Sequence, residues 1–89
     1  MYKLAFLGKA LDDFKKIDRA HQKIIRGKLL ILAENPEALK NNIRRLAAEE
    51  DLYRLKAGSY RIIFRKEERR LLILIIHIGH RREIYLSLK

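Results

Sequence analysis

The sequence predicts a single α+β domain over residues 1–89. In this fold an N-terminal strand and two antiparallel helices pack on one face of a mainly antiparallel four-stranded sheet (β-α-α-β-β-β). Three observations predict it: apolar residues alternate in residues 2–7, recur at helical spacing in residues 8–34, and alternate again in residues 52–65. The 89 residues are enough for one domain with one modest core.

The N-terminal half contains the first strand and the helical pair. Residues 2–7, YKLAFL, alternate like a short strand. The first helix has three apolar residues at helical spacing, namely Leu11, Phe14 and Ile17. The second helix, predicted from about Arg19, has the apolar residues Ile24, Ile25, Leu29 and Leu32. It ends near Pro36, because proline disfavours the helical conformation for the residue before it.

The C-terminal half contains the remaining strands. For residues 36–51, the sequence is compatible with either a helical turn or a loop. Two alternating runs, LYRLKA and YRIIFR, flank Gly58-Ser59 and predict a hairpin. A charged turn, KEERR, then leads to LLILIIHI (71–78), whose continuous apolar run suits a strand in the middle of a sheet. Gly79 ends this strand, and the last ten residues form a short tail or a last strand.

The net charge of +10 indicates an anionic partner. Residues 1–51 carry 11 basic and 8 acidic side chains, whereas residues 52–89 carry 10 basic and 3 acidic ones. Such an excess destabilises a folded chain by self-repulsion unless an anion offsets it, and nucleic acid is the commonest such anion. The alternative is a soluble basic protein whose lysines are only solvated.

Other protein classes fit the composition poorly. The chain has no cysteine, which excludes disulfides and thiolate metal sites. The missing cysteine and the lack of a visible signal peptide indicate the cytoplasm. The longest apolar run, Leu71 to Ile76, is too short to span a bilayer, so no membrane association is expected.

Alternation in the hairpin gathers cations on one face of the sheet. If Gly58-Ser59 forms a two-residue turn, Lys56 lies directly across from Arg61. The four cations on this face are Arg54, Lys56, Arg61 and Arg65. Like charges directly opposite destabilise a sheet by up to roughly 1 kcal/mol, so the pattern indicates a bound polyanion. A solvated outer face is the alternative, but such faces usually mix signs and this one has no acid.

Other residues complete the two faces of the hairpin. The residues predicted to pack on the helices are Tyr53, Leu55, Ile62 and Phe64. The residues that can rim the basic face beyond the central strand are His80, Arg81, Arg82 and Tyr85. Ile63, Ile73 and Ile75 are expected on or beside that face, where they offer apolar surface to an acidic, amphipathic partner segment.

Together these motifs resemble the RelE family of bacterial and archaeal toxins, within the wider RelE/ParE superfamily. The likeness covers nearly the whole chain, including the opening YKLAF, the helical pair and the NP that follows it. Its most specific part is Gly-x-Tyr-Arg at residues 58–61, followed about twenty residues later by Gly-His-Arg-Arg-x-x-Tyr at residues 79–85.

The resemblance implies a toxin that enters the ribosomal A site and cleaves the translated messenger RNA without a metal or other cofactor. It also implies a cognate RelB-like antitoxin, encoded beside the toxin, in a heterotetramer or larger complex. That complex represses its own operon, so operator DNA is contacted only through the antitoxin. The family's cations map onto Arg54, Lys56, Arg61 and one of Arg81 or Arg82, and its C-terminal tyrosine maps onto Tyr85.

The sequence departs from the family pattern in two places. Position 54 is Arg, where the well-studied enterobacterial toxin has Lys, which leaves the general base open. The chain also ends four residues after Tyr85, so a long C-terminal helix is missing. The sequence therefore does not determine which segment covers the outer face of the sheet.

Metal-free RNA cleavage needs a base for the ribose 2′-hydroxyl, cations for the phosphorane charge and an acid for the leaving 5′-oxygen. Arginine stabilises charge but cannot be the base, whereas lysine can where neighbouring cations and partial burial favour its neutral form. The candidate roles are Lys56 as base, Arg61 and Arg81 as phosphate clamps, and Tyr85 as stacking residue or proton donor. The further RNA-binding candidates are Arg54, Arg65, His80 and Arg82.

The histidines and glycines predict no metal or nucleotide site. His77 lies inside an aliphatic strand and is interpreted as a hydrogen-bonded core histidine, whereas His80, beside two arginines, is a candidate acid. Three histidines without cysteine do not suggest a metal site, and the four glycines form no phosphate-binding loop. No metal and no cofactor are therefore expected.

Two alternative functions remain open. A ParE-like toxin shares the fold but poisons DNA gyrase and is not a nuclease; the set Lys56, Arg61, Arg81 or Arg82, and Tyr85 argues against it. A non-catalytic RNA- or DNA-binding module would use the same cations without a reaction. The scarcity of aromatic residues on the basic face argues against a single-strand stacking platform.

Overall fold

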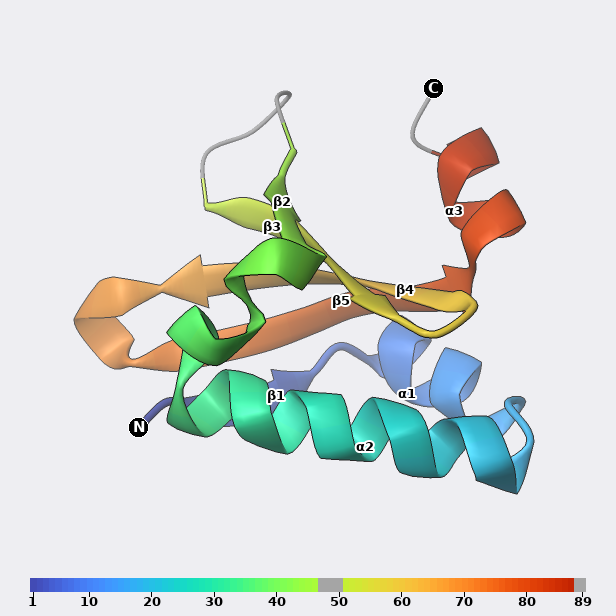
Figure 1. Ribbon diagram of the computed structural model, residues 1–89, viewed down its shortest axis with the longest axis horizontal. Helices are drawn as coiled ribbons and strands as arrows, with labels where there is room; N and C mark the ends of the chain where they lie inside the picture. Colours follow the sequence, from blue (N-terminus) through green and yellow to red (C-terminus); the bar gives the residue numbers. More distant parts are fainter. Residues whose placement is uncertain (47–50, 88–89) are drawn as a thin grey trace.

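The computed structural model describes residues 1–46 and 51–87, without the side chains of residues 85–87 (Figure 1). The strands are β1 (Lys3–Phe6), β2 (Ile43–Arg45), β3 (Leu52–Ala57), β4 (Tyr60–Glu67) and β5 (Leu72–His80). The helices are α1 (Gly8–Lys15), α2 (Arg19–Glu34) and α3 (Arg81–Ser87), with 3₁₀ segments η1 (Pro36–Asn42) and η2 (Glu68–Arg70). None of the helices in these ranges is long and apolar enough to cross a membrane.

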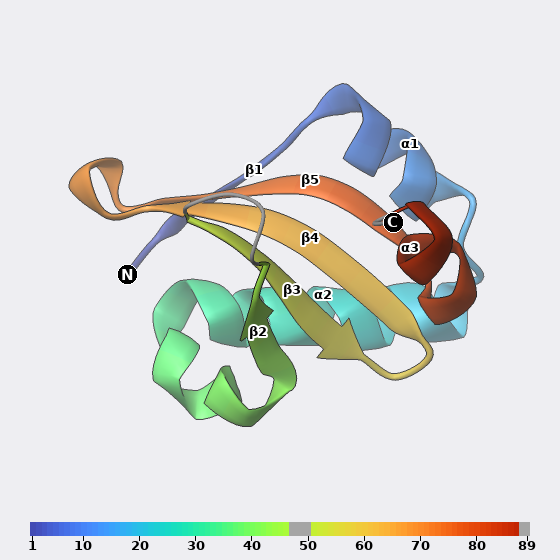
Figure 2. The same cartoon turned by 90° about the horizontal axis from the view of Figure 1, so that it is seen from above.

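The five strands form one mixed sheet in the order β1-β5-β4-β3-β2 (Figure 2). Only β1 runs parallel to its neighbour, β5, and the other pairs are antiparallel. The predicted α+β class, the N-terminal strand, the two helices before the hairpin and the central position of the 71–78 strand are confirmed.

The predicted number of strands was too low by one. The segment expected to be a turn or loop forms η1 and then β2, which pairs with β3 through Ile43 opposite Leu55. Three residues are too few to show a strand period, and this strand depends on its pairing with β3. β2 forms the edge of the sheet next to β3, beside the hairpin of β3 and β4 that carries the predicted cations.

Helices α2 and α3 lie on opposite faces of the sheet (Figure 1). Asp18 caps α2 by accepting a hydrogen bond from the backbone N–H of His21 at 3.2 Å. The buried residues Ile25, Leu29 and Leu32 turn one side of α2 into the core. Figure 1 shows α2 below the sheet and α3 above it. We call the sheet face away from α2 the outer face.

The core lies between the sheet and α2. Leu55, Ile62 and Phe64 face α2 as expected and are buried. Ile73 and Ile75 belong to the same core, so the expectation that they lie on the outer face was wrong. Their pairing explains this, because Ile75 is opposite Phe64 and therefore shares its face. Ile63 does lie on the outer face, opposite Arg54.

The C-terminal segment is a helix rather than a tail or strand. Ile84 of α3 is fully buried, and a Cβ added at Gly79 would come within 3.2 Å of its Cδ1 atom. The lack of a side chain at Gly79 therefore lets α3 pack closely on the outer face. The sequence left open what covers the outer face without a long C-terminal helix, and the short helix α3 covers it at the end of β5.

Beyond the end of β1, the carboxylate of Asp13 hydrogen-bonds to the free edge of β5. The Oδ2 atom of Asp13 in α1 accepts a hydrogen bond from the backbone N–H of Ile78 at 3.1 Å and lies 2.6 Å from Nδ1 of His77. Burial raises the pKa of Asp13, but these two bonds outweigh it and hold the pKa below its ordinary value. His77 is thus hydrogen-bonded, as the sequence predicted.

We expect Asp13→Asn to lower the free energy of unfolding at pH 7 by about 1–3 kcal/mol, the usual size of hydrogen bonds to a charged group. A carboxyl whose pKa is lowered by folding adds stability above its unfolded value, near 3.8, and loses it as the pH falls below that value. The gap between variant and wild type should therefore close below pH 4 in urea titrations. Asp12→Asn, at the exposed neighbouring position, is the control, and a gap independent of pH would contradict the prediction.

We expect Ile84→Ala to lower the free energy of unfolding by about 2–5 kcal/mol, because it leaves a cavity above Gly79. Ile24→Ala is the matched control, since Ile24 is 45% exposed and the same change there should cost under about 0.5 kcal/mol. Urea denaturation of both variants measures the difference. Equal losses would mean that α3 does not pack on the sheet in solution.

Candidate nucleic-acid interface

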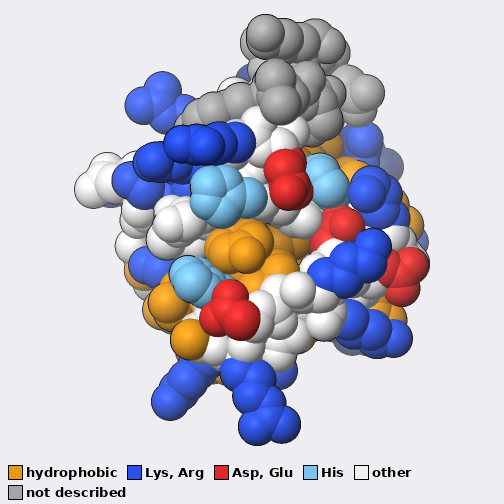
Figure 3. Space-filling model, turned by 90° about the vertical axis from the view of Figure 1, so that its right-hand side faces the viewer, with side chains coloured by type: hydrophobic (Ala, Val, Ile, Leu, Met, Phe, Trp, Pro, Cys, Tyr) orange, Lys and Arg blue, Asp and Glu red, His pale blue; other side chains and the backbone are white. Residues whose placement is uncertain are grey.

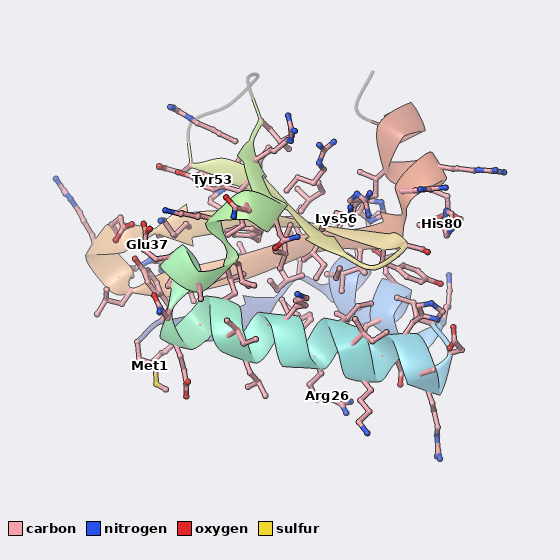
Figure 4. The ribbon with its side chains drawn as sticks, viewed as in Figure 1. Met1, Arg26, Glu37, Tyr53, Lys56 and His80 are labelled. Atoms are coloured by element: carbon pink, nitrogen blue, oxygen red, sulfur yellow. The ribbon has the colours of Figure 1, made fainter. Side chains whose placement is uncertain are left out.

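A hollow of about 360 Å³ opens on the outer face where η1, β2, β3 and β4 meet. Its lining residues are Asn41, Asn42, Arg44, Arg54, Lys56 and Arg61. Four of these six side chains are cationic, two are amides and none is acidic. Figure 4 labels Lys56, which lies on β3 between β2 and the turn into β4. This composition suits an anion with hydrogen-bond acceptors, such as a phosphate.

The register of three neighbouring strands creates the hollow. Lys56 lies opposite Arg61, and Ala57 lies opposite Tyr60, so the predicted two-residue turn and the predicted cross-strand pair are confirmed. On the other side of β3, Arg54 lies opposite Arg44. Two pairs of like charges therefore occupy directly opposed positions, an arrangement that costs stability in the absence of an anion.

Arg61 is held in a fixed orientation by the hairpin turn. Its side chain is only 6% exposed, and its Nη1 atom donates to the carbonyl oxygens of Gly58 at 2.9 Å and Tyr60 at 3.0 Å. Gly58 has a φ of +62°, which glycine adopts without steric cost. Lys56, by contrast, is exposed, so the expectation that partial burial favours its neutral form was wrong. The hollow thus combines a guanidinium fixed by hydrogen bonds with an amine that is open to solvent.

Arg65 and the cations of α3 lie outside the lining of the hollow. Arg65 is on β4 opposite Leu52, two residues beyond Ile63 on the same face. Arg81 and Arg82 are exposed at the start of α3, and the backbone N–H of Arg81 donates to the carbonyl of Ser59 at 2.9 Å. This bond holds the first residue of α3 beside the β3–β4 turn, next to Arg61.

The position of Tyr85 is given by its backbone alone. Tyr85 lies in α3, four residues after Arg81 and therefore about one helical turn further along. Its side chain lies outside the part of the chain that the structure describes. The predicted role of Tyr85 as stacking residue or proton donor thus stays a prediction.

His80 does not rim the basic face as expected. It pairs with Tyr60, and the two rings meet edge to face with centroids 5.8 Å apart. Tyr60 packs against the core, so His80 lies on the α2 side of the sheet. It lines a second hollow of about 190 Å³, together with Asp13, Lys16, Ile17, Tyr60, Ile78, Gly79 and Glu83. Figure 3 shows this end, where histidines and acids surround an apolar patch.

Three residues of the hollow were not predicted. Asn41, Asn42 and Arg44 come from η1 and β2, the segment that was expected to be a turn or loop. The sequence NNIRR, with two amides and two cations around one apolar residue, was the available signal. Only the pairing of β2 with β3 shows that Arg44 shares a face with Arg54.

The chain matches one family model and several solved structures. The model of the ParE toxin of type II toxin–antitoxin systems, parDE, matches residues 4–85. None of the curated proteins matches the chain significantly. RelE in the intact Escherichia coli RelBE toxin–antitoxin complex is 24% identical, with a TM-score of 0.77 over 90% of this chain and 96% of that one.

Two further complexes show the same fold. The RelE–RelB complex of the archaeon Pyrococcus horikoshii OT3 contains a chain that is 22% identical, with a TM-score of 0.75 over 90% of this chain and 94% of that one. The RelBE2 complex of Mycobacterium tuberculosis contains one that is 20% identical, with a TM-score of 0.68 over 90% and 98%. The chain therefore belongs to the ParE toxin family of type II toxin–antitoxin systems, and it has the fold of the RelE toxins.

Proposed function

We propose that this toxin inhibits translation by cleaving messenger RNA in the ribosomal A site, as a metal-independent endoribonuclease of the cytoplasm. The observation that carries the proposal is the hollow on the outer face, whose described lining brings together the four cations Arg44, Arg54, Lys56 and Arg61. A phosphodiester in this hollow would meet three arginines, whose planar guanidinium groups match the geometry of a phosphate, and one lysine. Its partners are the ribosome, the message and a RelB-like antitoxin, and operator DNA is reached through the antitoxin.

The proposed reaction uses the ribose 2′-hydroxyl of the message as nucleophile. Lys56, in its neutral form, takes the proton of this hydroxyl, and the 2′-oxygen attacks the adjacent phosphorus. The bond from phosphorus to the 5′-oxygen breaks, which leaves a 2′,3′-cyclic phosphate on one product and a 5′-hydroxyl on the other. Tyr85 is the candidate donor of the proton that the 5′-oxygen takes up, and stacking on a base is its alternative role.

The cations divide between charge stabilisation and positioning. Two arginines are assigned to the developing phosphorane charge: Arg61, whose guanidinium is held by the turn carbonyls, and Arg81, whose backbone is held beside the same turn by Ser59. Arg54 and Arg44 are assigned to the phosphates of the message on either side of the cleaved bond. Arg65 is assigned to extend the positive surface along β4, and Arg82 is assigned to extend it onto α3. His80 has no assigned part in the hollow, because it lies on the α2 side of the sheet.

Gyrase poisoning is the second candidate function, and the match to the ParE family model favours it. In that case the same cations would contact DNA or gyrase without cutting RNA. Two measurements separate the candidates. Primer extension on a translated message would show discrete stops inside codons for a nuclease. Trapped gyrase–DNA adducts would appear instead for a gyrase poison, and neither would appear for a binding module without a reaction.

We expect Lys56→Arg to slow cleavage on programmed ribosomes by roughly 10²–10⁴, the usual contribution of a general base. The positive charge is kept, so affinity for the ribosome should barely change. Single-turnover cleavage and affinity are measured separately. Arg61→Lys should be milder, because it loses the planar fork but keeps a charge. Lys23→Arg on α2 is the control. Cleavage at the wild-type rate by Lys56→Arg would remove Lys56 from the role of base.

We expect Arg44→Gln to weaken ribosome binding and to lower the slope of log affinity against log salt by about one, since one phosphate contact is lost. The cleavage rate of bound message should fall less than for Lys56→Arg. Arg69→Gln, at an exposed cation in η2 far along the sheet from the hollow, is the matched control. An unchanged salt slope would show that Arg44 makes no phosphate contact.

A further inference from the structure

Helix α2 has a second apolar side that the fold does not use. Its buried residues Ile25, Leu29 and Leu32 face the sheet. The stripe of Ala20, Ile24, Gly27 and Ile31, spaced by four, three and four residues, lies on the opposite side of the helix. Ile24 is 45% exposed and Ile31 is 42% exposed. A helix that is apolar on two opposite sides is typical of an element covered on both sides.

Gly27 lies in the middle of this stripe, and the chain's own packing does not require it. A Cβ added there would meet no atom within 4 Å, and its φ is not in the left-handed region. A glycine inside a helix costs roughly 1 kcal/mol relative to alanine. What glycine does provide is room for another backbone to approach closely. Both isoleucines and the glycine therefore fit a second helix that packs across α2.

The charges beside the stripe determine the kind of partner. Lys23 and Lys28 flank the stripe, and α2 carries two further cations, Arg19 and Arg26. Glu34 is the one acid in α2. Figure 4 shows Arg26 projecting from α2 away from the sheet. A second copy of the toxin would bring these cations against each other, whereas acidic side chains beside an apolar seam would pair with them.

We propose that the stripe of α2 is a docking site for an amphipathic helix with acidic flanks, contributed by the antitoxin. The proposal rests on membership of a toxin–antitoxin family and not on the proposed cleavage of message. The stripe lies on α2, which Figure 1 shows below the sheet, whereas the lining of the cationic hollow lies on the outer face. Antitoxin binding at α2 can therefore be changed without altering the hollow.

The test measures the affinity of purified toxin for the antitoxin encoded beside it, by titration calorimetry. Gly27→Leu adds a side chain into open space and replaces glycine with a better helix former, so the free toxin should melt at a higher temperature. The same side chain should block a close helix crossing and weaken antitoxin binding at least tenfold. The double variant Ile24→Glu with Ile31→Glu should weaken it at least a hundredfold, through lost apolar burial and like-charge repulsion.

Leu71→Gln is the matched control, because Leu71 is 50% exposed beside η2 and far from α2 in the sequence. It should leave the affinity unchanged. Binding within twofold of wild type by either α2 variant would overturn the proposal. A free toxin that sediments as a dimer, and that Gly27→Leu converts to a monomer, would assign the stripe to a second copy and would also overturn it. Cleavage activity enters neither readout, so a failure here is distinct from a failure of the proposed function.

Discussion

The site depends on the register of the β3–β4 hairpin. The turn at Gly58 and Ser59 places Lys56 opposite Arg61, and a shift by one residue would move these cations into the core. Arg61 itself stabilises the register, because its guanidinium binds the turn carbonyls of Gly58 and Tyr60. In the same turn, the carbonyl oxygen of Ser59 accepts a hydrogen bond from the backbone N–H of Arg81, the first residue of α3. One tight turn thus orients a buried cation, opposes it to an exposed one and positions the C-terminal helix.

Local patterns predicted the fold where neighbouring residues decide the structure. The hairpin followed from strict alternation around a glycine-containing turn, and the end of α2 followed from Pro36. β2 and α3 could not be predicted in this way. β2 has three residues and exists through pairing with β3, while α3 depends on the fit of Ile84 above Gly79. Both are consequences of contacts between segments that are distant in the sequence.

The same distinction explains the errors at the site. β5 is apolar on both faces, so its sequence does not reveal which residues face the helices, and an irregularity between Ile63 and Phe64 shifts its register. Ile73 and Ile75 were therefore placed on the wrong face. His80 follows Gly79, which lies opposite Arg61, and so it points to the other side of the sheet. Arg44 was missed because its strand was missed. Arg54, Lys56 and Arg61 were found because strand alternation alone brings them together.

The different exposure of the hollow's cations suits a division of roles. A buried guanidinium whose hydrogen bonds are made by the protein needs no reorganisation when charge develops on a phosphate, so Arg61 is suited to stabilise a transition state. The amine of Lys56 is exposed, so a bound message can contact it directly. Arg44 and Arg54 lie directly opposite each other on β2 and β3. Like charges in this position disfavour the pairing of two strands, and an anion bound between them would favour it, so this register suits a face that binds a polyanion.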